Sequence, residues 1–125
     1  MDGDRRRVLE TCAAQPFAER TFPFGNGVAV FKIGGKIFAL VGLTGTPGEV
    51  SLKVDPELGA ALVHQYGAVR PGYHLNKRHW VTVTLGGDLA EETLTELLED
   101  AYDLVLSGLP RRVRLVFENV GDQTG

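Results

Sequence analysis

Two adjacent glycines divide an apolar stretch of this chain into two runs, and they constrain its fold more than any other feature. Gly34 and Gly35 separate residues 28–33 from residues 36–41, and both runs are rich in β-branched and aromatic residues. A two-residue hairpin turn needs positive φ angles, which glycine adopts at low cost. The pattern therefore predicts an antiparallel β-hairpin.

The hairpin also predicts which strand residues face each other. A two-residue loop would pair Phe31 with Phe38 on one face and Val30 with Ala39 on the other. The face with the two phenylalanines is the more apolar one, so we expect it to face the core. The residues expected on this core face are Ala29, Phe31, Ile33, Phe38 and Leu40.

Two later segments, residues 49–54 and residues 80–85, alternate apolar and polar residues. This alternation is typical of half-buried strands, and it places Thr82 and Thr84 on the outward side of the second segment. Residues 68–78 show no such pattern. The residues expected to point inward are Val50, Leu52, Val54, Val81, Val83 and Leu85.

Three segments carry helix signals. Residues 5–14 predict a short helix, and residues 90–107 predict the longest one. Between them, Asp55 followed by Pro56 indicates a helix start, with Asp55 as N-cap and an end near Tyr66. The apolar stripe expected on the longest helix comprises Leu94, Leu97, Leu98, Ala101, Leu104 and Val105.

This order of elements indicates an α+β fold, with helices packed on one antiparallel sheet. Hydrophobic residues make up 43% of the chain and charged residues 23%, which excludes a disordered chain. We expect residues 1–125 to form a single domain. The sequence contains neither a run of roughly 20 apolar residues nor a signal-peptide pattern, so we expect a soluble cytoplasmic protein with no membrane partner.

Charge is unevenly distributed along the chain, although the net charge is only −3. Residues 28–80 contain six Lys or Arg against three Asp or Glu, a net of +3. Residues 81–108 contain seven Asp or Glu and no Lys or Arg, and we expect them to form a solvent-exposed acidic face. This balance argues against a general polyanion binder, but it leaves room for a local basic face.

Several short motifs occur in one order along the chain. They are Pro23-Phe24-Gly25, Phe31–Leu40, Ser51-Leu52-Lys53, Asp55-Pro56, Pro71–Trp80, Tyr102–Val105 and Leu109-Pro110. On these motifs the chain resembles the bacterial MmcQ/YjbR-like proteins over about residues 5–112. The resemblance implies an α-β3-α-β2-α fold and a DNA-binding role by way of a double-wing arrangement, in a family of uncharacterised proteins. Residues 113–125 lie outside it, and they either add an edge strand or dock on the body.

The segment 73–80 is the strongest candidate for a ligand site, and its candidate residues are Tyr73, His74, Asn76, Lys77, Arg78 and Trp80. The two cations suit phosphate groups, and the amide suits a base edge or a phosphate. The aromatic rings can stack on a base or another planar ligand. In the alternative interpretation, the aromatic rings anchor the strand to the core while Asn76 and His74 bond to local backbone.

Three further cations, Lys36, Lys53 and Arg70, would extend this segment into a basic face if the fold brings them near it. Contacts to roughly three to five phosphates would give a log–log salt slope of about −3 to −4.5. We expect no enzyme, cofactor or metal site, because the three histidines lack the spacing of zinc ligands. The single cysteine, Cys12, lies among small and apolar residues, which is typical of a buried, inert thiol.

Two functions are consistent with these residues. The first is a non-enzymatic module that binds nucleic acid, with DNA as the expected partner, through the basic face. The second is a module that binds a protein or a small planar ligand in the same region and has no nucleic-acid role. The net charge favours the second function, and the family resemblance favours the first.

Overall fold

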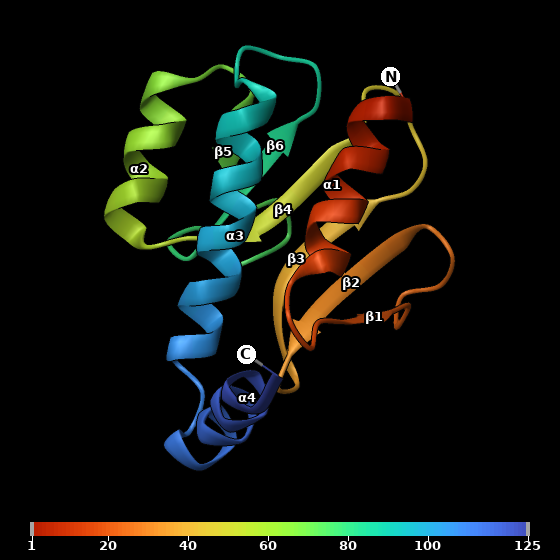
Figure 1. Ribbon diagram of the computed structural model, residues 1–125. Helices are drawn as coiled ribbons and strands as arrows, with labels where there is room; N and C mark the ends of the chain where they lie inside the picture. The colour runs from red at the N-terminus through yellow and green to blue at the C-terminus, as the bar shows by residue number, and fades with distance from the viewer. Residues whose placement is uncertain (1, 125) are drawn as a thin grey trace.

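A six-stranded antiparallel sheet forms the centre of the fold, as the computed structural model shows (Figure 1). The structure describes residues 2–124, and the side-chain surroundings of residues 4–118. The strands lie in the order β1-β2-β3-β4-β6-β5. The elements are α1 (Asp2–Ala14), β1 (Glu19–Thr21), β2 (Val28–Ile33), β3 (Lys36–Gly42), β4 (Glu49–Lys53), α2 (Pro56–Gln65), β5 (Val69–Pro71), β6 (Trp80–Thr84), α3 (Glu91–Ser107) and α4 (Arg111–Thr124).

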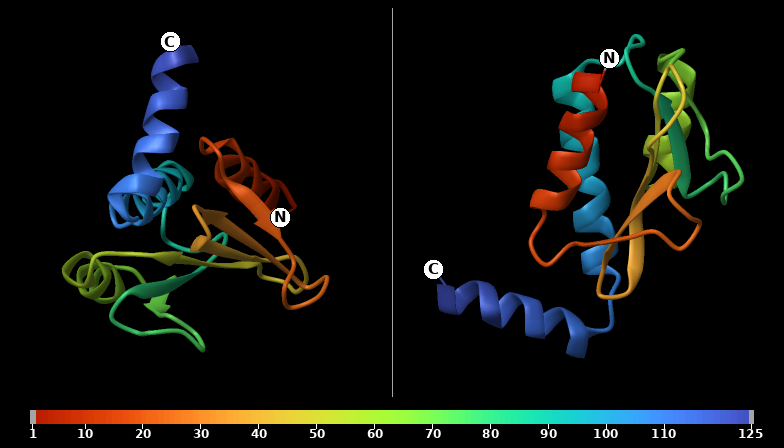
Figure 2. Two further views of the ribbon diagram at one scale, coloured as in Figure 1. Left: turned by 90° about the horizontal axis from the view of Figure 1, so that it is seen from below. Right: turned by 90° about the vertical axis from the view of Figure 1, so that its right-hand side faces the viewer.

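The helices gather on one side of the sheet. α1 and α3 lie side by side against this face, and α2 packs on β5 and β6 at its far end (Figures 1 and 2). The core between these helices and the sheet contains fully buried Phe31, Phe38, Leu52 and Leu98. Within residues 2–124, only loops lie over the opposite face, which we call the open face (Figure 2). The expected α+β fold is confirmed, with β1 and α4 as additions to the implied order.

The predicted hairpin is present, but the predicted cross-strand pairs are wrong by one residue. Near the turn, Ile33 pairs with Lys36 as a two-residue loop requires. A β-bulge then shifts the register, so that Phe31 lies opposite Ala39 and no longer opposite Phe38. An extra residue in one strand also reverses the alternation beyond it. Beyond the bulge, β3 therefore turns Ala39 and Val41 toward the core, and the prediction that Leu40 faces the core is wrong.

The other predicted faces are largely confirmed. Alternate residues of β4 and β6 are buried as expected, and the oxygen Oδ1 of Asp55 caps α2 by accepting a 2.9 Å hydrogen bond from the backbone nitrogen of Glu57. Two residues depart from expectation. Thr82 lies on the open face but is only 2% exposed, because the β5–β6 loop covers it. Leu104 belongs to the predicted apolar stripe of α3 but is 38% exposed.

The C-terminal segment forms the helix α4, which excludes an edge strand for residues 113–124. The helix begins beside the hairpin and projects from the body (Figure 2). Val113 and Phe117 pack against the core from its first turns, and the ring centroids of Phe117 and Phe17 lie 5.2 Å apart. In the part of the chain that the structure describes, none of the helices combines the length and apolar character that a membrane crossing requires.

Candidate ligand-binding surfaces

The loop between β5 and β6 carries most of the predicted site residues, and its own polar groups hold it in place. The oxygen Oδ1 of Asn76 accepts hydrogen bonds from the backbone nitrogens of Arg78 (2.9 Å) and His79 (3.3 Å). The Nζ of Lys77 donates to the carbonyl oxygen of Gly72 at 3.0 Å. This is the local-backbone alternative expected for Asn76, whose amide oxygen shapes the turn.

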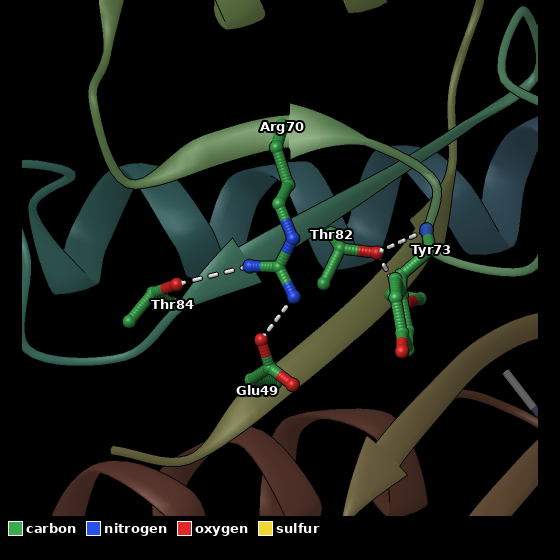
Figure 3. Close-up of polar contacts among 6 residues, drawn as sticks. Glu49, Arg70, Tyr73, Thr82 and Thr84 are labelled. Atoms are coloured by element: carbon green, nitrogen blue, oxygen red, sulfur yellow. Dashed lines mark hydrogen bonds and ion pairs between the residues drawn. The ribbon is translucent and has the colours of Figure 1, made fainter.

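Tyr73 and His74 form an exposed aromatic pair at the start of this loop. Their ring centroids lie 4.0 Å apart, and Tyr73 is 59% exposed. The backbone of His74 has a φ of 60°, a left-handed conformation uncommon for a non-glycine residue. The backbone nitrogen of Tyr73 donates to the hydroxyl oxygen of Thr82 at 3.0 Å, which ties the loop to β6 (Figure 3). These contacts place both rings over the open face.

Arg70 also lies on the open face, but its charge is balanced by a neighbour. The guanidinium forms an ion pair with Glu49 on β4 and donates to the hydroxyl of Thr84 at 3.3 Å (Figure 3). Its carbon Cζ lies 5.7 Å from the ring centroid of Tyr73. Arg70 therefore braces β5 against β4 and β6, and it adds little net positive charge to the face.

A hollow of about 510 Å³ lies on the open face between the strands and the exposed rings. The residues that line it include Phe24, Leu40, Ser51, Tyr73, His74 and Thr82. The hydroxyls of Ser51 and Thr82 are hydrogen-bonded to each other, so the floor of the hollow offers little free polar surface. This open-face hollow is therefore mainly apolar and aromatic.

A second cleft opens where β3 and β4 separate, and we call it the β3–β4 cleft. Pairing between these strands runs only from Val41–Val50 to Ala39–Leu52, so β3 extends beyond it toward the glycine turn. The cleft has a volume of about 730 Å³, within the usual range for ligand pockets. Its lining includes Lys36, Ile37, Lys53, His79, Trp80 and Leu104.

Inside this cleft, the ammonium nitrogen of Lys53 lies 5.4 Å from the ring centroid of Trp80, a cation–π contact across the β4–β6 pair. Asp55 lines the cleft and a narrower groove between α2 and α3, where Asp100 also lies. The negative groups therefore sit toward the helices. Lys36 sits at the strand end of the same cleft.

Lys77 and Arg78 line a neighbouring cleft together with Glu57, and Pro56 borders both clefts. Lys36 and Lys53 thus line one cleft and Lys77 and Arg78 the other, with Pro56 common to both, and we call these four residues the cationic face. Among the described residues, none of the four forms an ion pair with a carboxylate. The structure therefore divides the predicted site in two, because Arg70, Tyr73 and His74 belong to the open face.

Sequence reasoning missed several lining residues of both surfaces. His79 and Leu104 line the β3–β4 cleft, and Phe24, which is 67% exposed, lines the open-face hollow. The apolar stripe of α3 predicts that Leu104 belongs to the core, so only the structure shows that Leu104 lines a cleft. Among the described residues, no group of three or more His, Cys, Asp or Glu side chains is placed to hold a metal ion.

Comparison with known proteins places this chain in a family. The family model described as YjbR matches residues 13–104, most of the chain. The chain belongs to the YjbR family. The uncharacterized protein YbdF of Escherichia coli O157:H7 is 44% identical to this YjbR-family chain over 98 residues, which cover 78% of this chain and 80% of YbdF. The uncharacterized protein YjbR of Escherichia coli K12 is 36% identical over 107 residues, 86% and 91% of the two chains.

Solved structures of related proteins share this fold. The crystal structure of the Deinococcus radiodurans protein DR2400, a DUF419 domain, matches with a TM-score of 0.81 and 42% identity, over 89% of this chain and 85% of that one. A crystal structure from Pseudomonas syringae matches with a TM-score of 0.68 and 29% identity, over 80% and 97% of the two chains. The YjbR match ends before α4, so that helix lies outside the part that defines the family.

Proposed function

We propose that this YjbR-family chain is a non-enzymatic module that binds nucleic acid, with DNA as the first candidate, through the cationic face. One observation carries the proposal. Four cations that form no ion pairs among the described residues line two neighbouring clefts that meet at Pro56, and the half-buried Trp80 lines one of them. Cations next to an exposed part of an aromatic ring are the combination that phosphates and bases require.

The strength of such binding follows from the number of cations. Four phosphate contacts to duplex DNA give a log–log salt slope of about −3.6, so affinity would fall about 150-fold between 50 and 200 mM salt. The exposed acidic side of α3, with Glu92, Glu96, Glu99 and Asp103, opposes any polyanion that extends beyond the cationic face. Binding is therefore local and strongly salt-dependent.

The non-enzymatic part of the proposal rests on how the available nucleophiles are held. The thiol of Cys12 is buried in the core, and the hydroxyl of Ser51 is bonded to that of Thr82. Cys12 is therefore out of reach of a substrate in either cleft, and Ser51, although it lines the open-face hollow, has its hydroxyl engaged by Thr82.

Charge reversal tests the proposal. Anisotropy titrations with a labelled mixed-sequence duplex and its single strand, at 50 and 200 mM salt, would compare the wild type with Lys77→Glu/Arg78→Glu. The control is Arg6→Glu/Arg20→Glu, which makes the same change in net charge at exposed positions of α1 and β1. Loss of binding only in the first variant supports the proposal. Equal loss in both variants, or no binding by the wild type, contradicts it.

The open-face hollow favours a second function, the binding of a protein or a small planar ligand. Tyr73 and Phe24 are largely exposed there, and the charge of Arg70 is balanced by Glu49. Apolar exposure of this kind marks interaction sites. A thermal-shift screen of planar aromatic compounds tests this function. Stabilisation that Tyr73→Ser removes and Lys77→Glu/Arg78→Glu retains would support it, and a screen without stabilising compounds would count against it.

A further inference from the structure

We infer that the nucleic acid held by the cationic face is single-stranded, and that one unpaired base enters the β3–β4 cleft and packs on Trp80. This inference rests on the proposed function and specifies its ligand. The first argument is shape. The cleft is concave and about 730 Å³ in volume, and Ile37, Val54 and Leu104 give it apolar walls. It therefore has room for a flat, largely apolar group such as a nucleobase.

A duplex cannot supply such a group without being opened. Its bases are stacked inside, and it presents phosphates on its convex outer surface, so extruding a base costs a few kcal/mol. Single strands have bases that are free to leave the stack and to pack on aromatic side chains. Trp80 is half-buried and lines the cleft, so a group that enters the cleft can reach its ring.

The charges around the cleft fit the same arrangement. The ammonium of Lys53 lies over the ring of Trp80, 5.4 Å from its centroid, so a base that packs on this face must displace the ammonium, which can then pair with the phosphate of that base. Lys77 and Arg78, across Pro56, are placed for the next phosphates. Asp55 and Asp100 disfavour a path of the backbone along the groove between α2 and α3, while Glu57 offsets part of the charge of Lys77 and Arg78.

The test uses the intrinsic fluorescence of Trp80, which is the one tryptophan of the sequence. The probes are a 12-nucleotide DNA strand, the RNA strand of the same sequence, the DNA duplex, and a DNA strand of equal length with abasic sites at its centre. We expect both normal strands to quench Trp80, the abasic strand to bind with less quenching, and the duplex to bind most weakly. The ratio of DNA to RNA affinity identifies the natural source of the strand.

Substitution of Trp80 adds a second readout. Trp80→Leu should weaken single-strand binding about 5- to 150-fold, the range found for loss of one base–aromatic stack, while Trp80→Phe should restore much of it. Phe22→Leu, at an exposed ring that lines neither the β3–β4 cleft nor the open-face hollow, is the matched control and should leave binding unchanged. Circular dichroism checks that each variant is folded, and quenching in the wild type is independent of folding defects in the variants.

The outcomes separate the two proposals. Equal or tighter duplex binding, with Trp80 fluorescence unchanged, would overturn the single-strand inference and leave nucleic-acid binding standing. Failure of every probe to bind at 50 mM salt would remove the proposed function and the inference together. A salt dependence of about 50-fold between 50 and 200 mM, as four single-strand phosphate contacts predict, would support both.

Discussion

The hydroxyl oxygens of Ser51 on β4 and Thr82 on β6 lie 2.8 Å apart on the open face. The hydroxyl oxygen of Thr82 also accepts the backbone N–H of Tyr73, so one side chain joins two strands and the β5–β6 loop (Figure 3). We expect Thr82→Val to cost about 1–3 kcal/mol in the free energy of unfolding, because it leaves two covered polar groups without partners. Ser51→Ala should cost less, about 0.5–1.5 kcal/mol.

Urea unfolding of the two variants checks this order. Amide exchange at residues 73–80 should accelerate in Thr82→Val and stay close to wild type in Ser51→Ala, because only the first variant releases the loop. Equal costs for both variants would show that the bond to Tyr73 contributes little.

Local sequence patterns predicted most of the fold, but they missed the β-bulge that reverses the inward and outward faces of β3. Alternation and the glycine pair located the hairpin, and capping chemistry located the start of α2 at Asp55. The bulge beside Phe31 left no sequence signal, because the extra residue in β3 is itself an apolar phenylalanine that stays buried. The strands β1 and β5 have three residues each, too few for a period to be recognised.

The residue types of the candidate site could be predicted from the sequence, but the division of these residues between two surfaces could not. Residue types alone identified the cations and aromatic rings of segment 73–80. Whether a cation is free depends on its partners, and Glu49, which neutralises Arg70, lies 21 positions away in the sequence. The turn held by Asn76 likewise sends Tyr73 to the open face, while Trp80 lines the β3–β4 cleft.

The glycine turn gives a prediction with an internal control. Gly34 and Gly35 have φ angles of 58° and 82°, so alanine is strained at both positions, by about 1–2 kcal/mol. A Cβ at Gly34 would also lie 2.7 Å from Cδ1 of Leu109, whereas a Cβ at Gly35 meets nothing within 4 Å. We expect Gly34→Ala to lower the melting temperature clearly more than Gly35→Ala does. Equal melting temperatures would show that Leu109 moves aside freely.

Asp88 predicts a stability change in mild acid. Its carboxylate accepts hydrogen bonds from the backbone nitrogens of Ala68 and Gly67, both at 2.8 Å, and these bonds lower the pKa of Asp88 below its usual value. Deprotonated Asp88 therefore stabilises the folded state above the unfolded pKa of about 3.9, and this contribution is lost as the pH falls through the lower folded pKa. We expect Asp88→Asn to melt at a lower temperature than wild type at pH 7.

The same variant provides the check on the mechanism. Melting curves from pH 7 to pH 2.5 should converge for wild type and Asp88→Asn as the acid protonates Asp88. A difference in melting temperature that stays constant over this pH range would mean that the charge of Asp88 does not contribute to stability.

The thiol of Cys12 gives the last prediction. Burial in the core raises its pKa to about 12, against about 8.5 for a free cysteine. At pH 8 the thiolate fraction is then roughly 2,000-fold lower than in an exposed cysteine, even before access is considered. We expect Ellman's reagent to label the native protein only through unfolding. The labelling rate should therefore become independent of the reagent concentration when the reagent is in excess, and it should rise steeply above the midpoint of urea unfolding. Rapid labelling of the native protein in proportion to reagent would show that Cys12 is accessible, and that α1 opens from the sheet without global unfolding.

The raised pKa of Cys12 also makes the stability of the folded state depend on pH. Its contribution is present in full below about pH 8.5 and is lost as the pH rises toward 12. Between about pH 9 and 11, Cys12→Ala should therefore lose less stability than wild type.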